Sequence, residues 1–189
     1  MERRTFFKVC ATSMVVSGNS LVLVGKSRAN VEAKALSVID CKDLGKTALK
    51  HFIQENHTCS ESVLMAGCEC LGIKADIVPD IALGLAGGIG LQGKTCGAIT
   101  GGAMVLSLAV AAKEVDYMKK KMKILEAVGR LYTGFEKKYG SADCRSLCGV
   151  DLTTEQGRKA MKESVKQKKC TKFVEVASEI LSEELSNYL

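Results

Sequence analysis

Histidine is scarce in this chain, with only His51 and His57 among its 189 residues. Two histidines give no basis for a Ser-His-Asp catalytic arrangement, in which a histidine must act as the general base. The sequence also lacks a Cys-x-x-Cys-His motif, which excludes an attachment site for a c-type haem. His57 lies two residues before a cysteine, yet a position in a surface loop is favoured over a role as a metal ligand.

The alternation of apolar and polar residues that is typical of β-strands is missing as well. Residues 98–112 carry no charge, but fifteen residues are too few to span a membrane. Because this stretch is rich in glycine and alanine, it predicts a buried central helix instead.

Basic residues gather at the N-terminus. Arg3, Arg4 and Lys8 precede a mildly apolar run over residues 9–24, and small residues at a candidate cleavage point follow. The arginine pair with two phenylalanines after it matches the twin-arginine pattern. We therefore expect residues 1–35 to be a twin-arginine signal peptide that sends the protein to the periplasm, with no other membrane contact.

The rest of the chain is nearly neutral. Residues 1–35 hold six Lys or Arg and two Glu, so without them the formal net charge falls from +6 to about +2. Nothing that remains resembles the clustered basic and aromatic residues of a nucleic-acid interface. The lysines at 119–121 are expected to form a solvated helix face. Residues 36–189 suffice for one domain with its own core.

Apolar residues recur at helical spacing along this domain. The pattern predicts an all-α fold, a single helical bundle of about five to six helices, in which a glycine-rich loop over residues 84–102 enters the buried central helix. Thr58 and Glu61 have the spacing of a capping box, which would place Cys59 in the first turn of a helix, where the helix dipole stabilises a thiolate.

Two further helices are expected in the second half of the domain. A long amphipathic helix should end near Gly140, and Thr153 with Gln156 suggests a cap for a later helix. The long helix is expected to turn one set of apolar side chains inward: Val115, Met118, Met122, Leu125, Val128 and Leu131.

Residues 88–95 fit the Walker A pattern of phosphate-binding loops letter for letter. That mechanism needs a buried strand before the loop and a second strand that ends in an acid to hold Mg²⁺. Residues 80–86 make a poor strand, and the sequence downstream is helical in pattern. We therefore expect a structural glycine turn and not a nucleotide site.

Nine cysteines remain to be explained. Thiolates that converge from separate helices suit a [2Fe–2S] cluster, a [4Fe–4S] cluster or Zn²⁺, because these centres select soft sulfur ligands. Zinc sites usually show close Cys-x-x-Cys pairs, whereas the gaps here run to tens of residues, which favours a cluster or disulfides. Gly97 and Gly101 would let backbone N–H groups approach a sulfur closely. Both glycines are therefore expected to lie in the cofactor-binding site.

The glycine run at residues 87–90 followed by Cys96-Gly97-Ala98-Ile99-Thr100-Gly101 resembles the core of the C-GCAxxG-C-C family of redox-active proteins. The resemblance covers about residues 55–185. It implies that the metal ligands are Cys59, Cys96, Cys144 and Cys170, with Cys148 as a further candidate. The extra cysteines of this chain leave the ligand set open: Cys41, Cys68, Cys70 and Cys148.

The family is similar in its cysteine framework to the iron–sulfur portion of split-Soret cytochromes. The resemblance therefore implies an electron-transfer protein with an iron–sulfur cluster and a redox partner protein, and not a hydrolase or transferase; the N-terminal pattern adds that it is exported. Two alternatives stay open, a thiol–disulfide oxidoreductase and a structural helical module stapled by its cysteines. Zinc in place of the cluster, and assembly into a homo-oligomer, also stay open.

Overall fold

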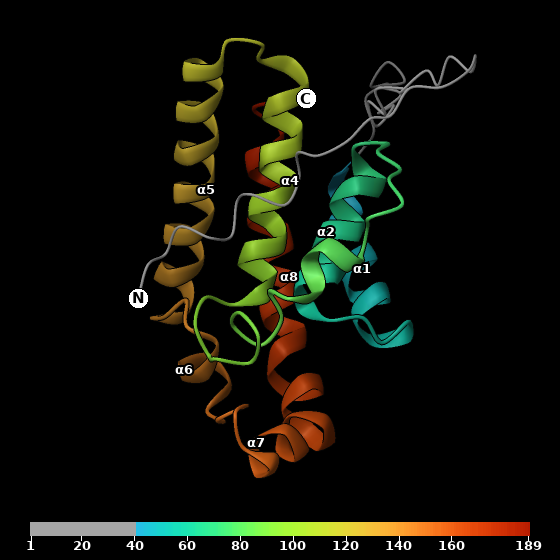
Figure 1. The fold of residues 1–189 in the computed structure, drawn as a ribbon, viewed down its shortest axis with the longest axis vertical. Coiled ribbons are helices and arrows are strands. Elements are labelled where there is room, and N and C mark those ends of the chain that lie inside the picture. Colours follow the sequence, from blue (N-terminus) through green and yellow to red (C-terminus); the bar gives the residue numbers. More distant parts are fainter. Residues whose placement is uncertain (1–40) are drawn as a thin grey trace, which may run out of the picture. The chain divides into compact units, whose positions relative to one another are not determined.

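The computed structural model describes residues 41–189 (Figure 1). This part of the chain is helical and contains no β-strand; one isolated bridge pairs Thr95 with Asp143. The prediction of an all-α domain is confirmed. The predicted signal peptide, residues 1–35, lies outside the described residues.

The described chain is a succession of helical segments, and two of the helices, α1 and α7, continue directly into π-helical segments. The elements are η1 (Cys41–Asp43), α1 (Leu44–Leu49), η2 (Lys50–Gln54), α2 (Cys59–Cys70), α3 (Asp80–Leu83), α4 (Gly97–Lys113), α5 (Tyr117–Tyr139), α6 (Cys144–Cys148), α7 (Glu155–Ala160), η3 (Met161–Cys170) and α8 (Thr171–Leu185).

Helix α4 lies at the centre of the domain, in contact with α2, α5 and α8, while α1 packs on α2 and α8 (Figure 1). Its side chains Ile99, Val105 and Leu106 are buried, which confirms the buried central helix. A Cβ atom at Gly67 of α2 would overlap Val105, so the absence of a side chain there lets the two helices approach closely.

No helix among residues 41–189 is both long and apolar enough to cross a membrane.

The ends of α2 and α5 follow the sequence signals. Thr58 Oγ1 accepts a hydrogen bond from the Glu61 N–H at 3.4 Å, and Glu61 accepts one from the Thr58 N–H at 2.8 Å, which confirms the capping box. Helix α5 ends at Gly140, whose φ of 73° lies in the left-handed region that favours glycine.

The expected cap of α7 is displaced by one residue. Thr154, and not Thr153, accepts the hydrogen bond from the Gly157 N–H, at 3.0 Å. Thr153 instead donates its hydroxyl to Asp151, at 2.7 Å. The aspartate offers a charged acceptor two residues away, and charge-assisted hydrogen bonds are the stronger ones.

The expected inward face of α5 is wrong over the first half of the helix. Met118, Met122 and Leu125 are exposed, and so is Val115 just before the helix. The buried residues are Ala127, Leu131 and Phe135, which follow a second apolar stripe on the opposite side of the helix. The sequence contains both stripes, and only the second one meets α4 and α8.

Cys41 and Cys70 form a disulfide between η1 and the last residue of α2, with the two Cα atoms 5.4 Å apart. The bond joins positions 29 residues apart in the sequence. Closing a loop of that length in the unfolded chain contributes about 3–4 kcal/mol to the free energy of unfolding in the chain-entropy model.

Candidate functional site

Five cysteines from four elements gather in one region, which we call the thiol cluster. Its members are the first residue of α2, the residue before α4, the two ends of α6 and the last residue of η3, namely Cys59, Cys96, Cys144, Cys148 and Cys170. Three are buried and two are half-buried. The four predicted ligands and the further candidate are thus brought together.

The thiols of the cluster are arranged in hydrogen-bonded groups. The Cys148 sulfur lies 3.8 Å from the sulfur of Cys144 and 3.6 Å from that of Cys170. Cys96 donates a hydrogen bond to Cys59. Charge on Cys59 acts on both Cys144 and Cys148, so the two groups are electrostatically linked.

The glycine-rich loop before α4 holds Cys96 next to α6. The Cys96 N–H donates to the carbonyl of Ala142 at 2.8 Å, and the Cys144 N–H donates to the carbonyl of Lys94 at 2.7 Å. A third bond runs from the Arg145 N–H to the Gly93 carbonyl at 3.0 Å. Backbone hydrogen bonds therefore fix the distance between Cys96 and Cys144.

The loop that fits the Walker A pattern uses its own N–H groups internally. Every N–H from Ile89 to Lys94 donates to a carbonyl within the loop or the turn before it, for example Gly93 to Gly87 and Lys94 to Gly88. The segment before the loop is the short helix α3 and not a strand. Phosphate-binding loops point free N–H groups at the ligand, so residues 88–95 serve to position Cys96.

Gly97 and Gly101 lie where helix α4 meets the start of α2. A Cβ atom at Gly97 would overlap the sulfur of Cys59, and one at Gly101 would overlap the carbonyl oxygen of Ser60. The missing side chains thus allow the backbone of α4 to approach both the Cys59 thiol and the backbone of α2. Their predicted place beside a cofactor stays a prediction.

The environment of Cys59 favours its thiolate. The hydrogen bond from Cys96, aided by the backbone N–H groups of Gly87 and Ser60, outweighs burial and lowers the pKa of Cys59 to about 7. The pKa of Cys96 is raised well above its ordinary value, because this thiol is the donor to Cys59 and is buried. At neutral pH Cys59 is therefore partly ionised, while Cys96 keeps its proton.

The other three sulfurs differ from Cys59. The pKa of Cys144 is raised by its hydrogen bond to Cys148, then by burial. The bond from Cys144 lowers the pKa of Cys148, but the bond to Cys170 and burial outweigh it and raise this pKa to about 12. Cys170 also points its thiol at the sulfur of Met161, at 3.8 Å. Cys144 and Cys148 are therefore protonated at neutral pH.

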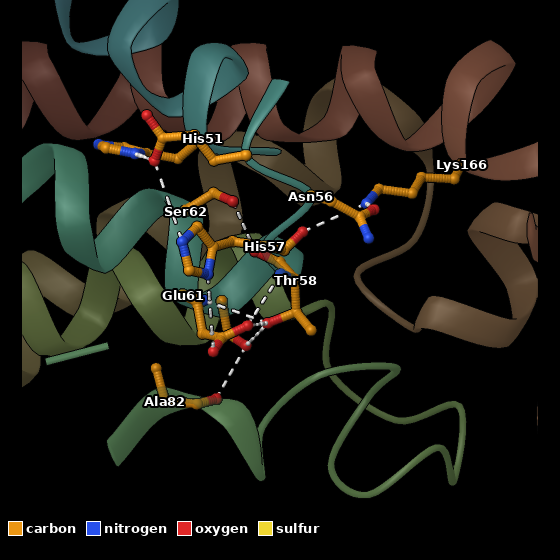
Figure 2. A network of polar contacts seen from close by, with 10 residues as sticks. His51, Asn56, His57, Thr58, Glu61, Ser62, Ala82 and Lys166 are labelled. Carbon is orange, nitrogen blue, oxygen red and sulfur yellow. Dashed lines mark hydrogen bonds and ion pairs between the residues drawn. The ribbon is translucent and has the colours of Figure 1, made fainter. Parts of the chain in front are cut away.

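Lys166 of η3 places a positive charge beside the thiol cluster. The sequence analysis did not identify this residue. Figure 2 shows its side chain directed at Asn56, where Nζ donates to Oδ1 at 2.8 Å; it also donates to the His57 carbonyl at 3.3 Å. Burial lowers the pKa of Lys166, and negative charge on Cys59 and Cys170 opposes that shift. The only sequence signal is the spacing of four residues, one helical turn, between Lys166 and Cys170.

Both histidines have carboxylate partners along α2, His51 at the end of the helix and His57 near its start (Figure 2). His51 is buried and lies 2.7 Å from Glu55 and 2.8 Å from Glu69. His57 is partly exposed and lies 4.0 Å from Glu61. Their nearest charged partners are carboxylates, so neither is assigned to the thiol cluster.

The remaining cysteines of the described chain sit near the far end of α2. Cys70 is in the disulfide, and Cys68 is a buried free thiol whose pKa is raised to about 11 by burial and by the charge of Glu69. Cys70 lies eleven positions after Cys59 along α2, which corresponds to roughly 16 Å at 1.5 Å per residue. Cys41, Cys68 and Cys70 are therefore distinct from the thiol cluster.

Within residues 41–189, no group of three or more Cys, His, Asp or Glu side chains is placed to hold a single metal ion. The sulfurs are spaced as thiols that hydrogen-bond in pairs. Chemically, the region offers five soft donors, one of them ionised near neutral pH, with a lysine at its edge.

A family model described as "Putative redox-active protein (C_GCAxxG_C_C)" matches residues 57–184, which include all five members of the thiol cluster. The chain belongs to the C_GCAxxG_C_C family. No curated protein and no solved structure matches it. The resemblance seen in the sequence is confirmed, and the C_GCAxxG_C_C description assigns redox activity to this cysteine-rich helical domain. Cys41 lies outside the matched residues.

Proposed function

We propose that the protein binds an iron–sulfur cluster through the thiol cluster and transfers electrons to or from a redox partner protein. The observation that carries this proposal is the convergence of the four family-matched cysteines from four separate elements. A two-cysteine exchange reaction would not need four such positions together, whereas a cluster takes four thiolate ligands.

The spacing of the sulfurs supports a [2Fe–2S] cluster, in which each iron takes two protein ligands. Two sulfurs on one tetrahedral metal with bonds of about 2.3 Å lie roughly 3.8 Å apart. The Cys144–Cys148 and Cys148–Cys170 separations are 3.8 Å and 3.6 Å. Cys59 and Cys96 would bind one iron, and two of the other three cysteines the second.

Two features of this region favour cysteines that bind metal as thiolates. When bound, the cluster supplies a one-electron redox couple. Cys59 is already stabilised as a thiolate, while Cys96 and Cys144 must lose protons when a metal binds. Lys166 places a positive charge near Cys59 and Cys170, which offsets part of the charge that the thiolates bring.

The test is the composition of the protein purified without oxygen. We expect a brown protein with visible absorption and about two iron and two acid-labile sulfide per chain, with zinc well below one. A colourless protein that contains neither iron nor sulfide would contradict the proposal.

A second candidate is thiol–disulfide exchange, favoured by the hydrogen-bonded pair of Cys59 and Cys96 at the start of α2. The Cys59 thiolate would attack a disulfide of a partner protein and release one partner thiol. Cys96 would then attack the Cys59 sulfur, release the second partner thiol and leave a Cys59–Cys96 disulfide, so that two electrons pass to the partner. A colourless protein in which mass spectrometry finds this pairing after oxidation by glutathione disulfide would favour exchange over the cluster.

Export to the periplasm by the twin-arginine pathway is part of the proposal. Arg3 and Arg4 support it, and the Cys41–Cys70 disulfide is of a kind that persists in oxidising compartments. We expect the Arg3→Lys, Arg4→Lys double variant to accumulate as precursor in the cytoplasm, and the control Arg28→Lys to be exported. Cell fractionation measures this, and unchanged export of the double variant would remove the twin-arginine argument.

A further inference from the structure

An apolar stripe on the outer side of α5 is exposed among the described residues. We call it the α5 stripe, and it consists of Val115, Met118, Met122 and Leu125, which are 93%, 59%, 50% and 56% exposed. The opposite side of the same helix packs on α4 and α8 (Figure 1). Single exposed apolar residues are common on protein surfaces, but a row of them along one helix marks an interaction surface.

The spacing of the stripe indicates a helix as its partner. Within the helix, Met118, Met122 and Leu125 are four and three positions apart, and Gly129 and Tyr132 continue the same alternation; Val115 lies just before the helix. This is the narrow a/d pattern by which two helices pack along a seam. A Cβ atom at Gly129 would meet nothing within 4 Å, so the seam is open from Met118 to Gly129, while Tyr132 packs partly against the core.

Along one edge of the α5 stripe, the charges of one copy are complementary to those of a second, antiparallel copy. Lys119 and Glu126 occupy equivalent heptad positions one repeat apart, on the same side of the seam. If two copies of α5 run antiparallel about a point between Met122 and Leu125, Lys119 of each copy faces Glu126 of the other. An anionic lipid surface would be matched by lysines alone, and the glutamate on this edge opposes it.

We propose that the α5 stripe is the contact surface of a homodimer in which the α5 helices of two copies pack antiparallel. This inference is independent of the redox chemistry proposed above. A single pair of helices makes a small interface, so the dimer should dissociate at concentrations on the order of micromolar.

Sedimentation equilibrium over a range of concentrations tests the proposal, with the full chain and the chain without residues 1–35 measured side by side. We expect both to approach twice the monomer mass at the highest concentrations. Leu125→Glu should weaken the dimer about tenfold or more, with an unchanged circular dichroism spectrum because the side chain is exposed. The matched control is Ile77→Glu, which changes an apolar side chain that is 61% exposed outside α5 and should leave the dimer intact.

The charge pair tests the antiparallel register. Lys119→Glu should weaken the dimer, and the double variant Lys119→Glu, Glu126→Lys should restore it. A wild-type chain that is monomeric at every concentration, or a dimer that Leu125→Glu leaves unchanged, would overturn the proposal. So would a monomer that binds vesicles of anionic phospholipid through the stripe, or dimerisation seen only when residues 1–35 are present.

Discussion

Serine in place of Cys59 or Cys96 will remove most of the iron that the chain binds, leaving about a tenth or less of the wild-type content. These two thiols are hydrogen-bonded to each other, and we expect both to be ligands. The other three thiols of the thiol cluster, Cys144, Cys148 and Cys170, are available for only two ligand positions. Cys144→Ser and Cys170→Ser should therefore each lose part of the iron, because Cys148 lies close to both sulfurs.

The double variants Cys144→Ser, Cys148→Ser and Cys148→Ser, Cys170→Ser should lose most of the iron. Cys68→Ser is the matched control, since Cys68 is an equally buried thiol at the far end of α2 and should leave the content unchanged. Iron and sulfide per chain, measured anaerobically, decide the outcome. Full retention in both Cys59→Ser and Cys96→Ser would exclude this pair as ligands.

Alanine at Gly101 should lower the free energy of unfolding by about 2–3 kcal/mol. The added Cβ atom would overlap the carbonyl oxygen of Ser60, which belongs to the backbone of α2 and cannot move without shifting that helix. Because α2 carries Cys59 as its first residue, the same shift should also reduce iron binding.

Gly84→Ala is the control for this change. A Cβ atom at Gly84 meets nothing within 4 Å and the residue has a φ of −63°, so alanine there should stabilise the protein by roughly 0.4–1 kcal/mol. Urea denaturation of both variants beside the wild type gives the two values. A Gly101→Ala protein as stable as the wild type would mean that α2 and α4 do not approach closely at this point.

Features of the sequence that act locally predicted the structure well. The capping box of Thr58 and Glu61, the end of α5 at Gly140 and the uncharged segment of α4 each depend on residues a few positions apart. The cysteines of the family motif were named from their order in the chain. That they gather in one place depends on contacts between segments far apart in the sequence.

The sequence alone could not predict which of several similar residues or helix faces would be used in the fold. Helix α5 has two apolar stripes, and only the packing of α4 and α8 decides that Leu131 is buried while Met122 is exposed. Cysteine spacing does not determine disulfide partners, so the Cys41–Cys70 bond was not foreseen. Lys166 is one of many lysines, and only the fold brings it to Asn56 and the thiols.

The glycine loop contacts both groups of thiols through main-chain atoms. The Gly87 N–H donates a hydrogen bond to the Cys59 sulfur, and the carbonyls of Gly93 and Lys94 accept hydrogen bonds from N–H groups of α6. A substitution at Lys94 leaves these peptide groups in place. A side chain at Gly88 or Gly93 would not, because φ is positive at both positions and an added Cβ atom would overlap Lys94 or Arg145. The separation of the two sulfur groups thus depends on the length of the loop and on its glycines, and not on its other side chains. Lys94 can therefore be replaced without altering this separation, whereas one inserted residue between Gly87 and Cys96 would alter it.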